Sequence, residues 1–277
     1  MVNIVVHLIQ NILHQLNLYK KYYYVNMRKR LIIGDIHGLG IVNDIYEYEA
    51  PDDVIILGDY FDSFNLSPLV QKLHFESLLR LREEHIKSNK GEFILILGNH
   101  DYHYMRDTME IYSGYNDETA GYVCNLVEDL YKKKVLQITY IDKINRIIFS
   151  HAGVTNSWFN ENCKTLEDIN NVSLSSLRFT YRDGGDFDGS SIWNSPIWVR
   201  PEGLMKDYYK DNNELIWNQI FGHTHNDEIV RRYIDDAYNT EKDAYFFNLD
   251  CLPNQYLIQH LDNDGKIKYN DFCNVDI

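Results

Sequence analysis

The chain has 277 residues, of which 44% are hydrophobic and 25% are charged, as is ordinary for a globular protein. Its formal net charge of −14 argues against extended binding to nucleic acid, because phosphate backbones recruit Lys and Arg. The four cysteines lie far apart without CxxC spacing, which argues against a zinc knuckle. Isolated cysteines in a chain of this length are typical of a reduced protein, so we expect a cytoplasmic location.

Residues 2–18, near the start of the chain, form a fairly apolar segment. Asn, Gln and His interrupt it, so no apolar run approaches the ~18 residues that a membrane span needs. It also lacks the positively charged start and the small-residue cleavage site of a signal peptide. Two interpretations stay open: a peripheral amphipathic helix, or an extension upstream of a natural start at Met27. We expect residues 1–27 to be an N-terminal extension and residues 28–277 to be one domain.

Short apolar runs along the chain predict strands that are buried on both faces. These runs are residues 31–33, 54–57, 93–97, 147–149 and 220–221. Helical patterns occupy residues 68–87 and 119–131, and strands that alternate with helices indicate a layered α/β fold. Residues 229–233, 244–249 and 256–261 are expected to be antiparallel strands that close the sheet. The Gly- and Asp-rich residues 183–191 predict a solvated turn, with a cation-binding loop as the alternative.

A polar cluster follows each of the five strand-like runs. The clusters are GDIHG at 34–38, GDYFD at 58–62, GNHD at 98–101, SHAG at 150–153 and GHTH at 222–225. In α/β folds, ligands bind beyond the carboxyl ends of the strands. Carboxylate, imidazole and amide ligands without a thiolate suit Mn²⁺, Fe or Zn²⁺. Two close cations need an anion between them, and Asp59 is our candidate for that bridging carboxylate.

In this order, the clusters resemble the calcineurin-like metallophosphoesterase superfamily over residues 31 to about 261. The resemblance implies an α/β fold that is a four-layer α-β-β-α sandwich of two mixed sheets flanked by helices. It also implies two divalent metal ions, Mn²⁺ before Fe or Zn²⁺, and hydrolysis by a hydroxide that bridges them. The implied ligands are Asp35, His37 and His225 for the first metal, Asp59 for both, and Asn99, His151 and His223 for the second.

The resemblance assigns roles beyond the metal ligands. His100 would be the proton donor, and Asp62 would orient it. Asn99 and Arg200 would bind the substrate phosphate, with a surface ion pair as the alternative role of Arg200. The isolated histidines are interpreted as ordinary core or surface groups, namely His7, His14, His74, His85, His103 and His260.

The GDYFD cluster resembles the GDYVDRG motif of protein Ser/Thr phosphatases. Here Ser63 and Phe64 follow it, so the phosphate-binding Arg of that motif is missing. Residues 195–201, SPIWVRP, are similar to the tryptophan–arginine segment of bacterial and phage phosphatases of the same branch, and they contain Arg200. GNHD in place of GNHE, and the second histidine of GHTH, are closer to the broader superfamily. The sequence therefore combines features of two branches.

Aromatic residues near the clusters could stack on a nucleobase, although packing is the preferred interpretation. They are Tyr60, Tyr102, Tyr104, Tyr112, Tyr115 and Trp198. Three functional hypotheses remain. The first is a metallophosphatase acting on phosphate monoesters, either phosphoproteins or small phosphoesters. The second is a phosphodiesterase or dinucleoside-polyphosphate hydrolase, and the third is a metal-bound binding scaffold without turnover.

Overall fold

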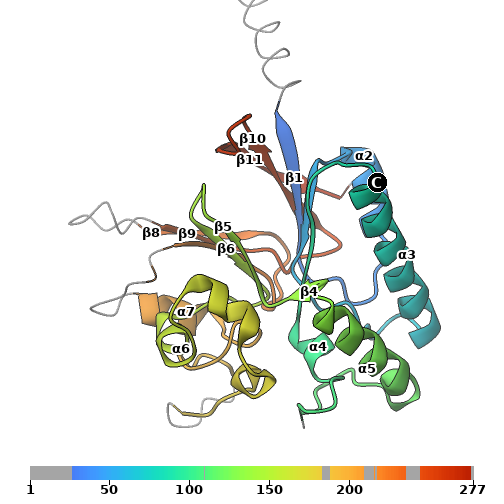
Figure 1. The fold of residues 1–277 in the computed structure, drawn as a ribbon, viewed down its shortest axis with the longest axis vertical. Coiled ribbons are helices and arrows are strands. Elements are labelled where there is room, and N and C mark those ends of the chain that lie inside the picture. The colour runs from blue at the N-terminus through green and yellow to red at the C-terminus, as the bar shows by residue number, and fades with distance from the viewer. Residues whose placement is uncertain are drawn as a thin grey trace, which may run out of the picture.

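The computed structural model describes residues 27–108, 110–182, 188–208, 215, 217–234 and 244–275. Two β-sheets lie against each other, with helices on their outer sides (Figure 1). Residues 1–26, and residues 183–187 of the predicted turn, lie outside the described residues. The two interpretations of the N-terminal segment therefore stay predictions.

The first sheet has six strands in the order β11-β10-β1-β2-β3-β4. Strands β1 to β4 run parallel, whereas β10 is antiparallel to β1 and β11 is antiparallel to β10. Their bounds are β1 Arg28–Ile33, β2 Asp53–Ile56, β3 Phe93–Ile96, β4 Leu136–Gln137, β10 Gln255–Leu261 and β11 Ile267–Asn274.

The second sheet has five strands in the order β5-β6-β7-β9-β8. Strands β6, β7 and β9 are parallel, and β5 and β8 are antiparallel edges. The bounds are β5 Thr139–Asp142, β6 Ile147–Ser150, β7 Asn218–Phe221, β8 Val230–Ile234 and β9 Ala244–Asn248. The expectation that the last strands all close one sheet antiparallel is wrong. Of the three predicted strands, only the one at 256–261, β10, joins the first sheet, whereas β8 and β9 lie in the second. There β9 pairs parallel with β7, because a strand pattern does not specify the partner strand.

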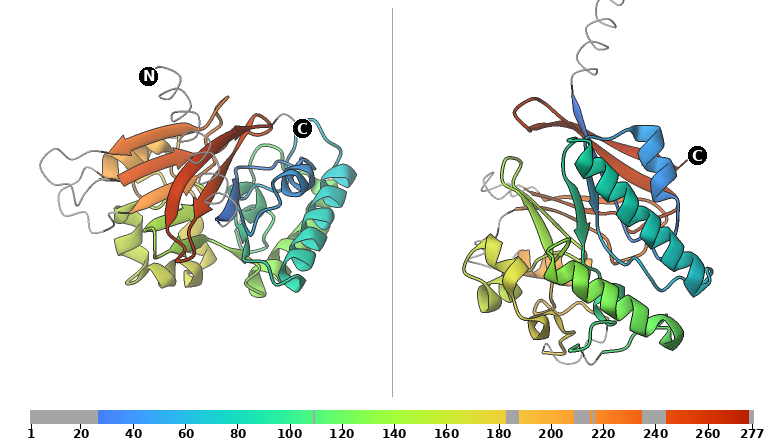
Figure 2. Two further views of the ribbon diagram at one scale, coloured as in Figure 1. Left: turned by 90° about the horizontal axis from the view of Figure 1, so that it is seen from above. Right: turned by 45° about the vertical axis from the view of Figure 1, so that its right-hand side comes forward.

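Helices cover both outer faces, which gives the predicted four layers (Figures 1 and 2). The first sheet packs against α2, α3 and α5, and the second against α7, with α6 beside α7. Short helices α4, η1 and η2 lie in the connections. The bounds are α2 Val42–Glu49, α3 Pro68–Lys87, α4 Asn99–Tyr102, α5 Asp117–Lys132, α6 Asn156–Asn162, η1 Leu166–Asn171, η2 Leu174–Leu177 and α7 Pro201–Tyr208.

Strand β1 shows why these runs are apolar throughout. Leu31 and Ile33 pack toward the helices, whereas Ile32 packs toward the second sheet, so both faces are buried. The predicted helix at 68–87 is confirmed, with the Ser67 hydroxyl accepting a hydrogen bond from Val70 N at its start. Asn116 caps α5, which begins at Asp117, two residues ahead of the predicted start.

All four cysteines are free. Among the described residues, every helix is too short or too polar to cross a bilayer.

Candidate active site

The five polar clusters meet at the carboxyl ends of the central strands. Asp35 follows β1, Asp59 follows β2 and Asn99 follows β3, while His151 and His223 follow β6 and β7 of the second sheet. Backbone hydrogen bonds continue the strand pairing into these loops. His37 N donates to the carbonyl oxygen of Asp59 at 2.7 Å. A similar bond of 2.7 Å joins Gly222 N to the oxygen of His151.

A cavity of about 460 Å³ opens where the loops meet. It is lined by eight of the ten predicted site residues together with Asp250 and three other residues. The lining is Asp35, His37, Asp59, Asn99, His100, Tyr112, Ser113, Trp198, Arg200, His223, His225 and Asp250. The other two predicted residues, Asp62 and His151, are buried behind this surface. The structure therefore brings residues from both sheets to one cavity.

Asp59 stands between two groups of potential ligands. Its Oδ2 lies 3.8 Å from His37 Nε2 on one side and 3.4 Å from His151 Nε2 on the other. Asn99 Oδ1 lies 2.8 Å from His151 Nε2 and 2.9 Å from His223 Nδ1. Donor atoms of Asp35, Asp59 and His151 all lie within 4.8 Å of one another. These separations suit side chains that face a shared cation.

Backbone carbonyls orient two of the imidazoles. His37 Nδ1 lies 3.1 Å from the oxygen of Phe61, and His151 Nδ1 lies 2.9 Å from the oxygen of Leu57. Each Nδ1 must carry the hydrogen to donate to a carbonyl, so the lone pair of each neutral ring is on Nε2. Both Nε2 atoms face Asp59. Metal-binding histidines in proteins commonly have this arrangement.

Two glycines allow carboxylates to approach the backbone closely. A Cβ atom on Gly98 would lie 2.1 Å from Asp59 Oδ1, and one on Gly222 would lie 2.0 Å from Asp35 Oδ1. Both positions exclude any side chain, because real Cβ atoms do not approach so closely. The glycine that begins GNHD and the glycine that begins GHTH are therefore each required by the carboxylate beside them.

Left-handed backbone is concentrated at this site. Four of the eight described non-glycine residues with positive φ are His37, Asp59, Asp62 and His223, with φ from 43° to 67°. Such conformations are costly for residues with a Cβ, and they persist where the surrounding structure holds them. Here the strained backbone lies in the loops that place candidate site residues at or directly behind the cavity.

The electrostatics of the cavity favour a cation. Burial raises the pKa of Asp35 well above its usual range, and the charges of Asp250 and Asp59 raise it further. Burial also acts to raise the pKa of Asp59, but nearby histidines, His151 first, outweigh it and lower that pKa. Burial lowers the pKa of His151 and of His223, which favours the neutral form of each ring, the form that binds metals. Crowded carboxylates and neutral imidazoles are the donor set that divalent transition metals prefer.

His100 and Asp62 form the predicted pair. His100 Nδ1 lies 2.8 Å from Asp62 Oδ2. Burial acts to lower the pKa of His100, but the charges of Asp59 and Asp62 raise it to about 9. Burial likewise acts to raise the pKa of Asp62, and its contacts with His100, His103 and Tyr104 lower it to about 2. The pair is therefore a charged imidazolium on a carboxylate near neutral pH.

Arg200 lies at the cavity beside the GHTH loop. Its Nη1 donates to the carbonyl oxygen of His223 at 2.8 Å and contacts Thr224 Oγ1 at 3.2 Å, while Nε donates to the oxygen of Asp188 at 3.3 Å. These partners of the guanidinium are uncharged oxygens, so they do not neutralise its positive charge at the cavity. Position and charge suit the predicted contact with phosphate.

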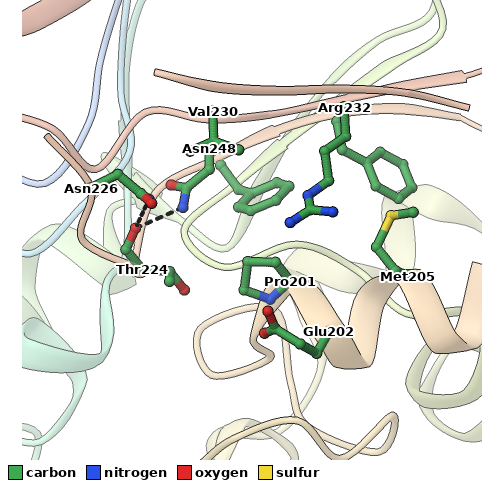
Figure 3. Close-up of a pocket in the computed structure, with 10 residues that line it drawn as sticks. Pro201, Glu202, Met205, Thr224, Asn226, Val230, Arg232 and Asn248 are labelled. Carbon is green, nitrogen blue, oxygen red and sulfur yellow. Dashed lines mark hydrogen bonds between the residues drawn. The ribbon is translucent and has the colours of Figure 1, made fainter. Parts of the chain in front are cut away.

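The GHTH loop is also fixed from behind. The oxygen of Thr224 accepts hydrogen bonds from Asn226 Nδ2 at 2.5 Å and from Asn248 Nδ2 at 2.7 Å. Figure 3 shows both asparagines pointing at Thr224 along one side of a small second pocket of about 80 Å³. His225, at the end of the loop, remains 69% exposed, with Nδ1 3.6 Å from Asp250 Oδ1. It lies at the rim of the cavity rather than within the tight group around Asp59.

Sequence reasoning missed two carboxylates. Asp250 is buried and lies two residues beyond β9, so its position after a strand-like run was the signal that could have revealed it. Asp101 is fully buried and accepts hydrogen bonds from Asp59 N, Tyr60 N and Gly98 N at 3.0, 2.8 and 2.9 Å. The fourth residue of GNHD therefore ties two of the loops together.

The aromatic residues near the clusters mostly serve packing. Tyr60 and Tyr102 are buried and donate their hydroxyls to the backbone oxygens of Ile96 and Leu174. Tyr104 contacts Asp62, and Tyr115 stacks on Tyr104. Only Tyr112 and Trp198 of the six named aromatics line the cavity, with ring centroids 4.4 Å apart.

Two mixed sheets flanked by helices, with a cage of carboxylates and histidines at the strand ends, define the class of metallo-dependent phosphatase folds. One solved structure supports this fold, and two others are similar with TM-scores below 0.5. A cold-active protein-tyrosine phosphatase of a psychrophilic Shewanella species matches with a TM-score of 0.50 and 15% identity, over 89% of this chain and 80% of that one. A protein serine/threonine phosphatase from Saccharomyces cerevisiae has a TM-score of 0.49 and 16% identity, over 89% of this chain and 80% of that one. A metallophosphoesterase from Sphaerobacter thermophilus has a TM-score of 0.45 and 15% identity, over 91% of this chain and 89% of that one.

The family follows from the sequence. A model of the calcineurin-like phosphoesterases matches residues 28–227, and the chain belongs to this family. No curated protein matches the chain. The family and the candidate metal-binding group around Asp59 support a metal-dependent hydrolase of phosphate esters.

Proposed function

We propose that this protein hydrolyses phosphate monoesters with the help of two divalent metal ions. The observation that carries the proposal is the position of Asp59 Oδ2 between His37 Nε2 and His151 Nε2. A carboxylate with imidazole lone pairs on both sides can hold two cations at once. When bound, the cations supply positive charge that polarises the phosphate and lowers the pKa of the attacking water.

Each predicted metal ligand has a proposed place in this site. Asp35, His37 and His225 would hold the first ion, and Asn99, His151 and His223 the second. The exposed position of His225 makes it the loosest of these ligands. Mn²⁺ is the proposed metal, because the donors are oxygens and imidazole nitrogens, and Fe or Zn²⁺ would fit the same set.

Proton transfer and phosphate binding fall to residues on the cavity wall. We propose that His100 Nε2 donates a proton to the leaving oxygen, since Asp62 holds Nδ1 and the raised pKa keeps the ring protonated. Arg200, together with Asn99, would bind the phosphate oxygens. A guanidinium can donate two parallel N–H bonds to two unesterified phosphate oxygens, of which a monoester has three and a diester two.

The test compares p-nitrophenyl phosphate with bis-p-nitrophenyl phosphate, using protein stripped with EDTA and reloaded with Mn²⁺. We expect turnover of the monoester that depends on the metal. His100→Asn should lower kcat by ~10²–10⁴-fold and leave the bound Mn²⁺ unchanged. His260→Asn is the matched control, because His260 pairs with Asp271 on β10 and β11, opposite Lys29 at the start of β1. It should retain full activity.

Faster turnover of the diester would favour a phosphodiesterase or a dinucleoside-polyphosphate hydrolase. Bound metal without hydrolysis of either ester would favour the binding scaffold. The proton-donor assignment fails if His100→Asn is nearly as active as the wild-type protein.

A further inference from the structure

We propose that His103 is a positioning residue that holds the Asp62–His100 pair in register for proton donation. The inference rests on the proposed function of His100. In the sequence, His103 is one of the isolated histidines interpreted as ordinary core or surface groups, and its contact with Asp62 forms only in the folded chain.

Asp62 is held by three side chains. Its Oδ2 lies 2.8 Å from His100 Nδ1 and 2.7 Å from His103 Nε2, while Oδ1 accepts the hydroxyl of Tyr104 at 2.5 Å. The side chains of His103 and Asp62 are 0% and 1% exposed, so water does not compete for these contacts. His103 Nε2 is close to Asp62 Oδ2, but the angle of this contact is too small for a hydrogen bond. One carboxylate oxygen is therefore shared between two imidazoles.

The orientation of His103 is fixed from its other side. The backbone N–H of Tyr112 donates to His103 Nδ1 at 3.2 Å, so Nδ1 is an acceptor. In the neutral ring, the hydrogen must then be on Nε2, which faces Asp62. The ring stacks on Tyr112 with an interplanar angle of 10° and meets the edges of Tyr104 and Tyr115. Packing and tautomer together place the Nε2–H of His103 beside Asp62 Oδ2.

This geometry has a consequence for catalysis. A carboxylate held by His100 alone could rotate about its terminal torsion, which is broad and soft. The contacts from His103 and Tyr104 restrict that rotation. Because His100 takes its orientation from Asp62, a fixed carboxylate keeps His100 Nε2 directed at the cavity. His103 does not line the cavity around Asp59, so it acts through Asp62 and not on the substrate.

The experiment uses leaving groups that differ in their need for a proton. The Mn²⁺-loaded full chain is assayed with 2,4-dinitrophenyl, p-nitrophenyl and phenyl phosphate. Dinitrophenolate leaves without protonation, whereas phenolate needs a proton from the donor. We expect His103→Phe, which keeps an aromatic ring and removes both nitrogens, to lower kcat for phenyl phosphate by ~10–100-fold. With the dinitrophenyl ester, kcat should change less than ~3-fold, and KM should stay constant for all three esters.

His103→Gln is the rescue variant, because its amide can still donate to Asp62. It should recover most of the activity on phenyl phosphate. If His103→Phe does not fold, as judged by its urea unfolding curve, His103→Leu replaces it as the variant without nitrogen. An equal loss on all three esters would show a structural role and overturn the inference, as would a failure of Gln to exceed Phe.

Two further outcomes are distinguishable. If the wild-type protein hydrolyses none of the three esters, the proposed function fails, and the inference fails with it. Asp62, His100 and His103 also lie close enough together to hold a metal ion. Three Mn²⁺ ions per wild-type chain that fall to two in His103→Phe would replace the positioning role with a metal site.

Discussion

Replacing Asp101 tests how the loops that carry the candidate metal-binding residues are held in place. Its carboxylate is fully buried, and it joins the loop after β2 to the loop after β3. Oδ2 accepts the N–H groups of Asp59 and Gly98, and Oδ1 accepts that of Tyr60. Asp101→Ala removes all three acceptors. Asp101→Asn keeps the shape of the side chain but only one oxygen.

The magnitude follows from the number of unpaired donors. A buried N–H group without an acceptor costs ~1–3 kcal/mol. Three such groups in Asp101→Ala cost about 3–9 kcal/mol, and water that enters the vacated space would bring the loss toward the lower limit. In Asp101→Asn the remaining oxygen can serve Asp59 and Gly98, so only Tyr60 N–H is left facing an amide donor. That loss is ~1–3 kcal/mol.

The assay is urea unfolding of the metal-free protein, followed by circular dichroism. We expect the free energy of unfolding to decrease in the order wild type, Asp101→Asn, Asp101→Ala. Calorimetric titration with Mn²⁺ should show weaker binding to both variants, because the backbone of Asp59 loses its anchor. Asp129→Asn is the control, since Asp129 is half exposed and pairs with Lys133, and it should stay within ~0.5 kcal/mol of wild type.

Two results would refute this reasoning. One is a free energy of unfolding of Asp101→Ala within ~0.5 kcal/mol of wild type, which would mean that the three donors find other partners. The other is an equal loss in the Asn and Ala variants, which would mean that the number of acceptors does not set the cost.

Three other predictions concern the metals, the phosphate and the buried ion pair between the sheets. Asp59→Asn should lose the metal pair, and mass spectrometry that still finds two Mn²⁺ ions per chain would contradict the bridging role. Arg200→Ala should raise KM for p-nitrophenyl phosphate by ~10-fold or more at unchanged metal content, because charged hydrogen bonds contribute ~1.5–3 kcal/mol; unchanged KM and kcat would exclude it as a phosphate ligand. Arg30 Nη1 and Asp142 Oδ2 lie 2.7 Å apart, and both side chains are buried. Asp142→Ala should therefore cost ~3–5 kcal/mol at pH 7, measured by urea unfolding. Burial acts to raise the pKa of Asp142, but the hydrogen bonds from Arg30 and Asn145 lower it, so its stabilisation is present above the unfolded pKa of ~3.9 and is lost as pH falls through the folded value. The difference between wild type and variant should shrink on acidification, and a difference independent of pH would contradict the pair.

The sequence by itself determined the chemistry of the site and the class of the fold. Every ligand-type residue predicted at a strand end lies at or directly behind one cavity, because parallel strands buried on both faces end at the same edge of a layered α/β fold. The apolar runs and the glycine-containing polar clusters are patterns of the sequence, so they are visible in the chain itself. The contacts that require Gly98 beside Asp59 and Gly222 beside Asp35 form only on folding. The family resemblance added the expected assignment of each ligand to the first or the second metal ion.

Only the tertiary structure decided which strands share a sheet and which buried groups support the site. Strand β9 could pair in either sheet until its contacts with β7 were known, because pairing joins segments far apart in the chain. Asp101 stands in the GNHD cluster without an assigned role, and Asp250 and His103 lie outside the five clusters. Their roles come from backbone donors and side chains that folding places beside them. Contacts of this kind depend on position in space, which residue type and spacing alone do not specify.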